Sequence, residues 1–288
     1  AKRVGKKKPV IALKGGRTAA GAEAAASHTG AMASNVKVFK AVCKQAGIIL
    51  VDQPMDLLDL SAAFSSLPLP NGKKVGIMTL GGGWGVVASD LCMENGLEVP
   101  HLSGEVITRL NKLLPEFWNH ANPVDLVGEM NTDIHMTILE ELLQWDGCDA
   151  VIHMGIIGRR IMIQAVLEST KQLDPKSYPE NFVEGSIIFL DEFEKRFVER
   201  TVHLMGKYEK PVAGVYLLND NKTHTITEVP GCKYKGVNFI TPERTTLVAS
   251  THRVYATAEK VVPTDGRYDA QKILEAAPKV AQKAVLFD

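Results

Sequence analysis

The fold of this chain is most constrained by one pattern, a strand followed by a glycine-containing turn and a helix, which recurs at least three times. Apolar runs within 10–13, 74–80 and 149–154 predict buried strands. Each run precedes glycines and then a segment whose apolar residues have helical spacing. Strands that alternate with helices pair in parallel through right-handed crossovers. The sequence therefore predicts an α/β fold built from doubly wound parallel sheets.

A proline-spaced stretch at 67–72, with the sequence LPLPNG, is the clearest break in this pattern. Such a stretch is typical of a linker that ends in a turn. We therefore expect two domains, residues 1–70 and 71–288, which are ordinary sizes for a chain of 288 residues. Within the second domain, 174–210 predicts a helical insertion with a packing role, because its large apolar residues recur at helical spacing.

The composition argues against several classes of function. The formal net charge is zero and the isoelectric point is near 7.3, so bulk charge favours neither nucleic acid nor an acidic membrane. No apolar run approaches the length that spans a bilayer. Zinc motifs are missing, and the four cysteines are scattered without a C-x-x-C pair. We expect a cytoplasmic protein with reduced thiols, no metal site, no membrane contact and no nucleic-acid contact.

One histidine, His28, stands out by its surroundings. It follows a loop rich in glycine, alanine and serine and precedes a segment of helical spacing, so we expect it where a helix begins. Thr29 is expected to cap that helix, and Gly30 to let the backbone approach a ligand. The first turn of a helix attracts anions through unpaired N–H groups and the helix dipole. A histidine there can be a base, a clamp or a nucleophile that forms phosphohistidine; the alternative is an ordinary surface histidine.

Two segments carry a resemblance to a known family. KPVIALKGGR at 8–17, followed by ASHTGA at 26–31, resembles the phosphohistidine segment of the NDP-forming acyl-CoA synthetases. These are the ADP-forming acetyl-CoA synthetases, relatives of succinyl-CoA synthetase. The resemblance implies two flavodoxin-like domains, and it implies that His28 is phosphorylated. The residues expected to bind the phosphoryl group beside it are Ser27, Thr29, Gly30 and Ala31.

The second domain adds further expected site residues. NPVDL at 122–126 matches the second signature of the family, and GGGWG at 81–85 carries Trp84 where the family usually has proline. The resemblance implies an acyl-side pocket formed by Gly81, Gly82, Gly83, Asn122, Pro123 and Asp125. An ordinary turn-capping role for Asp125 stays open. In relatives a later helix points its N-terminus at the phosphohistidine from the opposite side, a role that Gly155 and Gly158 fit.

The resemblance implies a reaction and a set of partners. Acyl-CoA, ADP and phosphate would interconvert with the carboxylic acid, CoA and ATP through the phosphohistidine. This chemistry requires CoA, ATP or ADP, and Mg²⁺ at an ATP-grasp unit, yet neither that unit nor a CoA-binding domain is recognisable in this sequence. We expect an ATP-grasp subunit or domain as partner, a homo- or hetero-oligomer, and no ligand beyond phosphate on this chain. Because Ala1 falls within what resembles the end of a helix, we expect a fragment.

Two other functions stay open on the sequence. The chain can be a non-catalytic acyl-CoA-binding regulatory module, as in a synthetase-like fusion with a protein lysine acetyltransferase. It can also be a flavodoxin-like scaffold that only binds partners. The intact Ser27-His28-Thr29-Gly30 motif favours the synthetase, because a scaffold does not require a histidine to coincide with an anion-binding junction.

Overall fold

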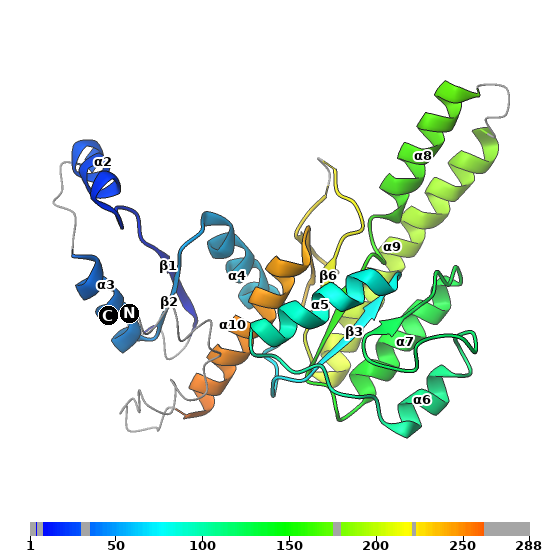
Figure 1. Cartoon of the computed structure of the whole chain (residues 1–288), viewed down its shortest axis with the longest axis horizontal. Helices are drawn as coiled ribbons and strands as arrows, with labels where there is room; N and C mark the ends of the chain where they lie inside the picture. The colour runs from blue at the N-terminus through cyan, green and yellow to red at the C-terminus, as the bar shows by residue number, and fades with distance from the viewer. Residues whose placement is uncertain (1–3, 5–7, 30–34, 175–179, 221–222, 262–288) are drawn as a thin grey trace.

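The computed structural model describes residues 4, 8–29, 35–174, 180–220 and 223–261, and Figure 1 shows their arrangement. Two parallel strands, β1 (Val10–Leu13) and β2 (Ile48–Val51), form a small sheet near the start of the chain. Helices α2 (Ala19–Thr29) and α3 (Val36–Ala46) connect them. The side chain of Asn35 accepts hydrogen bonds from the backbone at the start of α3, and Gly47 ends that helix in the left-handed conformation.

The rest of the described chain forms a six-stranded sheet in the order β4-β3-β5-β6-β8-β7. All neighbours are parallel except β7, which is antiparallel to β8. Taken along the chain, the five parallel strands have the spatial order 2-1-3-4-5, which is that of flavodoxin-like folds. The structure confirms the expected α/β class. The strands are β3 (Val75–Thr79), β4 (Val124–Asp125), β5 (Ala150–Met154), β6 (Val212–Val215), β7 (Ile226–Thr227) and β8 (Gly236–Phe239).

Helices cover both faces of this sheet. Helices α5 (Gly82–Glu94) and α10 (Pro242–Val261) pack together on one side, and α7 (Thr132–Gln144) packs with α9 (Glu180–Tyr208) on the other. Successive side chains of a strand point to opposite faces of the sheet. Ile77 therefore belongs to the core cluster under α5, and Met78 belongs to the larger cluster on the opposite face. A short helix, α6 (Gly104–Leu110), lies before β4.

Helix α4 (Pro54–Ser66) joins the small sheet to the large one (Figure 1). It packs against β1 and β2 and also against α10 and β8. Asp59 of α4 is buried and forms a two-pronged ion pair with Arg244 of α10. The proline-spaced stretch that follows is packed rather than exposed, since Leu67, Pro68 and Pro70 are buried.

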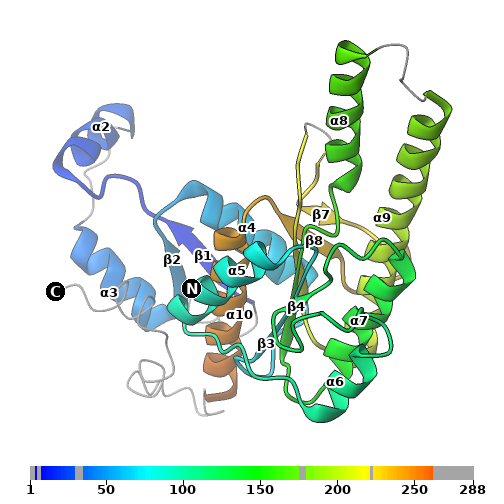
Figure 2. The same cartoon turned by 45° about the vertical axis from the view of Figure 1, so that its right-hand side comes forward.

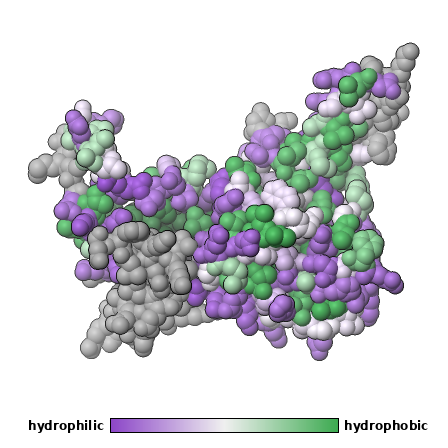
Figure 3. All heavy atoms as spheres, viewed as in Figure 1, coloured by the Kyte–Doolittle hydropathy of each residue, from purple (hydrophilic) through white to green (hydrophobic). Residues whose placement is uncertain are grey.

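Helices α8 (Arg159–Leu173) and α9 pack side by side and project from the sheet as an arm, as both views show (Figures 1 and 2). The base of α9 enters the core, where Phe193 and Phe197 are fully buried, so the helical pattern expected for this segment is confirmed. The projecting part exposes apolar side chains, several of which are visible in Figure 3. No helix in the described ranges is both long and apolar enough to cross a membrane.

Candidate functional site

The carboxyl edge of the large sheet between β3 and β5 is where ligands bind in folds of this kind. From β3 the chain passes to β4 on one side and then crosses to β5 and β6 on the other, so the strand order reverses between β3 and β5. Open α/β sheets bind ligands in the crevice outside the carboxyl ends at such a reversal. Two of the glycine junctions predicted from sequence, 81–83 and 155–158, follow these two strands. The structure therefore brings them to one edge.

The first junction begins α5 without a side-chain cap among the described residues. The hydroxyl of Thr79 donates a hydrogen bond of 2.8 Å to the carbonyl of Gly81 and fixes the turn. A Cβ added at Gly82 would lie 2.6 Å from a carboxylate oxygen of Asp125, whereas Cβ atoms at Gly81 and Gly83 would meet no described atom within 4 Å. The helix start is therefore open to a ligand on one side and faces a carboxylate on the other.

The signature at 122–126 shapes this edge mainly through the backbone. The amide of Asn122 accepts a hydrogen bond of 2.9 Å from the Ile77 N–H and donates to the carbonyls of Val75 and Pro100. Both amide hydrogens are thus used to join the loop at Asn122 to β3 and to the segment at Pro100. The role that the structure shows for Asn122 is structural, and its place in the expected acyl pocket stays a prediction.

Pro123 and Asp125 lie against the start of α5. A Cβ at Gly85 would come within 3.0 Å of the Pro123 ring, so only glycine allows this close packing. One carboxylate oxygen of Asp125 accepts a hydrogen bond of 2.8 Å from the Val127 N–H, which is the turn-capping role left open by the sequence. The other oxygen faces Gly82. The structure places Pro123, Asp125 and Gly82 together, and their role in an acyl pocket stays a prediction.

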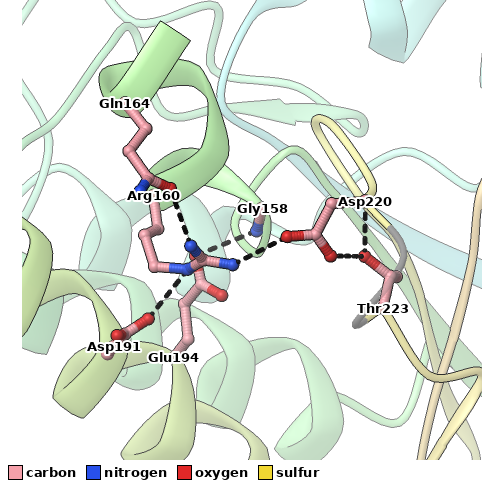
Figure 4. Close-up of polar contacts among 7 residues, drawn as sticks. All are labelled: Gly158, Arg160, Gln164, Asp191, Glu194, Asp220 and Thr223. Atoms are coloured by element: carbon pink, nitrogen blue, oxygen red, sulfur yellow. Dashed lines mark hydrogen bonds and ion pairs between the residues drawn. The ribbon is translucent and has the colours of Figure 1, made fainter. Parts of the chain in front are cut away.

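The second junction, at the start of α8, already holds an anion. Gly155 and Gly158 adopt positive φ angles, and a Cβ at Gly158 would lie 2.4 Å from the Leu218 carbonyl oxygen. The N–H of Gly158 donates a hydrogen bond of 2.9 Å to a carboxylate oxygen of Glu194 (Figure 4). The backbone of Arg160 also favours the charged form of this carboxyl and acts to lower its pKa. The position expected to bind phosphate is therefore occupied by a carboxylate from α9.

A network of charged side chains lies beside this carboxylate. The guanidinium of Arg160 pairs with Asp191 of α9 at 2.9 Å and with Asp220, after β6, at 3.1 Å (Figure 4). These contacts tie α8, α9 and the segment after β6 around a pocket of about 380 Å³ that Gly158 and Glu194 also line. Sequence analysis missed Glu194, because it comes 36 positions after Gly158 and only the packing of α9 on α8 brings them together.

The local structure predicted for His28 is wrong. Residues 19–29 form helix α2 rather than a loop, because the alanine-rich run has high helix propensity and the Thr18 hydroxyl accepts a hydrogen bond from the Gly21 N–H at its start. His28 is exposed in the last turn of α2, which carries the negative end of the dipole. Thr29 belongs to α2 and does not begin the next helix.

The other residues expected around His28 give less information. Ser27 is exposed in the same helical turn as His28. Gly30, Ala31 and the side chain of Thr29 lie outside the described residues. The next helix begins at Val36, where Asn35 caps it. The roles of these residues in binding a phosphoryl group stay predictions.

Other histidines are buried and kept neutral. Burial lowers the pKa of His135 to about 4, that of His153 to about 3 and that of His252 to about 4. The role of His153 is structural, since the side chain packs against Phe197 in the core. In the described part of the chain, no group of three or more His, Cys, Asp or Glu side chains is arranged to hold a metal ion.

Comparisons with known proteins agree with the resemblance. The profile of the succinyl-CoA ligase like flavodoxin domain matches residues 1–64, and that of the ligase-CoA domain matches residues 75–167. The chain is 38% identical over 157 residues to acetate–CoA ligase (ADP-forming) II subunit alpha of Pyrococcus furiosus, covering 54% of this chain and 34% of that protein. Residues 1–64 thus belong to the succinyl-CoA ligase like flavodoxin domains, and residues 75–167 to the ligase-CoA domains.

Further comparisons agree with this assignment. The chain is 40% identical over 129 residues to acetate–CoA ligase (ADP-forming) of Methanocaldococcus jannaschii, covering 45% of this chain and 18% of the relative. A solved dinucleotide-forming acetyl-coenzyme A synthetase 1 of Ca. Korarchaeum cryptofilum, in complex with phosphate and ADP, superimposes with a TM-score of 0.60 and 26% identity. That match covers 90% of this chain and 49% of the other. The chain thus spans about a third or less of the two acetate–CoA ligases and about half of the solved synthetase chain.

Proposed function

We propose that this chain is the part of an NDP-forming acyl-CoA synthetase that carries the phosphohistidine and a second ligase domain. The reaction interconverts acyl-CoA, ADP and phosphate with carboxylic acid, CoA and ATP. The observation that carries the proposal is an exposed His28 within an intact SHTG motif, in a chain whose relatives are named as ADP-forming ligases. Residues 1–70 and 71–288 are the two proposed domains, and a cytoplasmic location fits them.

In the proposed mechanism His28 carries the phosphoryl group. A neutral ring nitrogen attacks the phosphorus of an acyl phosphate, the P–O bond to the acyl group breaks, and the carboxylate leaves. The resulting phosphoramidate then transfers the phosphoryl group to the terminal oxygen of ADP, which yields ATP and returns the neutral imidazole. The exposure of His28 is consistent with this role, since both partners must reach the ring.

In this proposal His28 must reach the carboxyl edge of the large sheet, although α2 carries it elsewhere. In both views α2 lies well away from the β3/β5 edge of the large sheet (Figures 1 and 2). The two helix starts at that edge therefore receive a phosphoryl group from His28 only after the segment changes position, or from another copy. Gly15 and Gly16, between β1 and α2, supply a hinge, because Gly16 adopts a positive φ angle that most residues avoid.

The proposal assigns roles to the sheet edge. Gly81–Gly83 and Asp125 line the acyl side, where the uncapped α5 start offers N–H groups to a developing negative charge. Gly155 and Gly158 begin the helix that faces the phosphoryl group. An ATP-grasp partner supplies the nucleotide site with Mg²⁺, and a CoA-binding domain supplies the thiol. Support for a partner comes from a relative that is named as an alpha subunit.

A labelling experiment tests the proposal. The chain is incubated with an ATP-grasp partner from a related synthetase, Mg²⁺ and ATP labelled at the γ-phosphate. We expect one acid-labile phosphate on the wild-type chain and none on His28→Asn. His101→Asn is the matched control, because His101 is also exposed, and it should label like the wild type. Label that survives in His28→Asn, or a wild-type chain that stays unlabelled by an active partner, would contradict the proposal.

A further inference from the structure

The start of α8 is closed by a side chain of the protein itself. Glu194 accepts a hydrogen bond from the N–H of Gly158, a group that a bound anion would use, and the backbone of Arg160 also acts to lower the pKa of the Glu194 carboxyl (Figure 4 shows the Gly158 bond). Its carboxylate comes from the base of α9, a helix held in the core by Phe193 and Phe197. A negatively charged group thus already lies where the proposed function places a phosphoryl group.

Burial at this position disfavours the charged form of Glu194. Burial raises the pKa of this carboxyl above its usual value, although the backbone hydrogen bonds and Arg160 act in the other direction. Asp191, one turn earlier on α9, also raises it by like-charge repulsion. The carboxylate therefore loses part of its hydration where it lies, which lowers the free-energy cost of replacing it with another anion.

Arg159 supplies a second indication of an anion site, and the charge of Glu194 acts to raise the pKa of its guanidinium. Its side chain, at the first position of α8, is only 3% exposed. Within the described residues, its Nε and Nη2 atoms have no hydrogen-bond partner. The guanidinium carbon lies 4.8 Å from the centre of the Phe193 ring, so the group lies beside the turn of α9 that carries Glu194. A buried cation without a hydrogen-bonded anion is costly, and a pairing anion would relieve that cost.

We propose that Glu194 is a built-in competitor that closes the phosphoryl site at the start of α8, and that Arg159 is a latent ligand for the anion that displaces it. This inference rests on the proposed function, because it concerns the helix start that would receive the phosphoryl group. The pocket of about 380 Å³ beside Gly158 and Glu194 gives the displaced carboxylate room to move. The ligand is a tetrahedral dianion, either free phosphate or the phosphoryl group on His28.

Sulfate is the first probe, because it is a tetrahedral dianion that does not titrate near neutral pH. Its affinity for the wild-type chain, Glu194→Gln and Glu192→Gln is measured by titration calorimetry. Glu192 is the matched control, since it is an exposed carboxylate on the same helix. Replacing the charged competitor by a neutral one should tighten sulfate binding by roughly five- to tenfold in Glu194→Gln and leave Glu192→Gln unchanged.

The role of Arg159 is tested in the same background. Adding Arg159→Met to Glu194→Gln should weaken sulfate binding by roughly tenfold, whereas Arg159→Lys should retain part of the gain. Thermal unfolding is recorded for each variant to confirm that it is folded. The proposal fails if Glu194→Gln binds sulfate no more tightly than Glu192→Gln. The latent-ligand part fails if folded Arg159→Met binds as tightly as its parent.

A third measurement identifies the source of the anion. The chain is phosphorylated chemically with phosphoramidate, and the phosphorus NMR signal of His28 is assigned by its absence in His28→Asn. A shift of that signal between wild type and Glu194→Gln shows that the carried group reaches α8, while an unshifted signal with tight sulfate binding identifies free phosphate as the ligand. Sulfate binding that persists while enzymatic labelling of His28 fails would overturn the proposed function alone.

Discussion

The buried ion pair between Asp59 and Arg244 gives a stringent test of how α4 joins the large sheet. Asp59 is almost fully buried and Arg244 is mostly buried, with two hydrogen bonds between carboxylate and guanidinium. Asp59→Ala removes both bonds and leaves a cation in the α4–α10 contact. Removing one partner of a buried pair costs about 3–5 kcal/mol of the free energy of unfolding, and the part exposure of Arg244 places the expected cost near the lower end, about 3 kcal/mol.

Arg244→Ala should cost at least as much, because the carboxylate left behind is the more buried partner. The double variant should cost clearly less than the sum, with a coupling energy of about 1.5 kcal/mol or more. Urea unfolding followed by tryptophan fluorescence measures all three. Arg17→Ala is the control, since its pair with Asp52 is substantially exposed and is expected to contribute about 0–1 kcal/mol. Additive effects, or an Asp59→Ala cost no larger than that of Arg17→Ala, would refute the reasoning.

The remaining predictions concern the site and the interior. Gly158→Ala should lower the free energy of unfolding by about 2 kcal/mol or more and shift the α8 start, because φ is 88° and the new Cβ would lie 2.4 Å from a carbonyl oxygen; Gly83→Ala, with open space around it, should change stability little. Three buried neutral histidines should lower the free energy of unfolding as the pH drops below about 6.5, namely His135, His153 and His252. The unfolded chain binds protons at these histidines below that pH, whereas the folded chain does not bind them until about pH 4 or lower. Thermal unfolding at pH 7.5 and 5 should show this loss, up to about 2 kcal/mol per histidine at pH 5; equal stability at both values would contradict it.

The α/β class and the glycine junctions after the strands were predictable because they depend on local pattern. Apolar runs followed by glycines mark strands that end at the ligand edge, and the structure places both later junctions there. The helical pattern of α9 was also readable, since Phe193 and Phe197 recur at helical spacing and are both buried. Periodicity of this kind reports which face of an element is packed.

The local structure around His28 was not predictable by the same means. Glycine, alanine and serine suggested a loop, but a run of alanines favours a helix once Thr18 caps it. Glu194 was missed for a different reason, because its contact with Gly158 depends on how two helices pack rather than on local sequence. The buried guanidinium of Arg159, whose Nε and Nη2 have no hydrogen-bond partner in the described part of the chain, likewise follows from the position of α9. Contacts between distant residues are where the sequence pattern gave no signal.

The central claim is that His28 carries a phosphoryl group during turnover. The most direct test is tandem mass spectrometry of the chain, quenched under alkaline conditions during reaction with an ATP-grasp partner, Mg²⁺ and ATP. The account predicts one phosphoryl group, localised to the peptide that contains His28, and its loss when ADP is added in excess. A phosphoryl group on any other residue, or an unmodified His28 while ATP is turned over by the assembled enzyme, would contradict it.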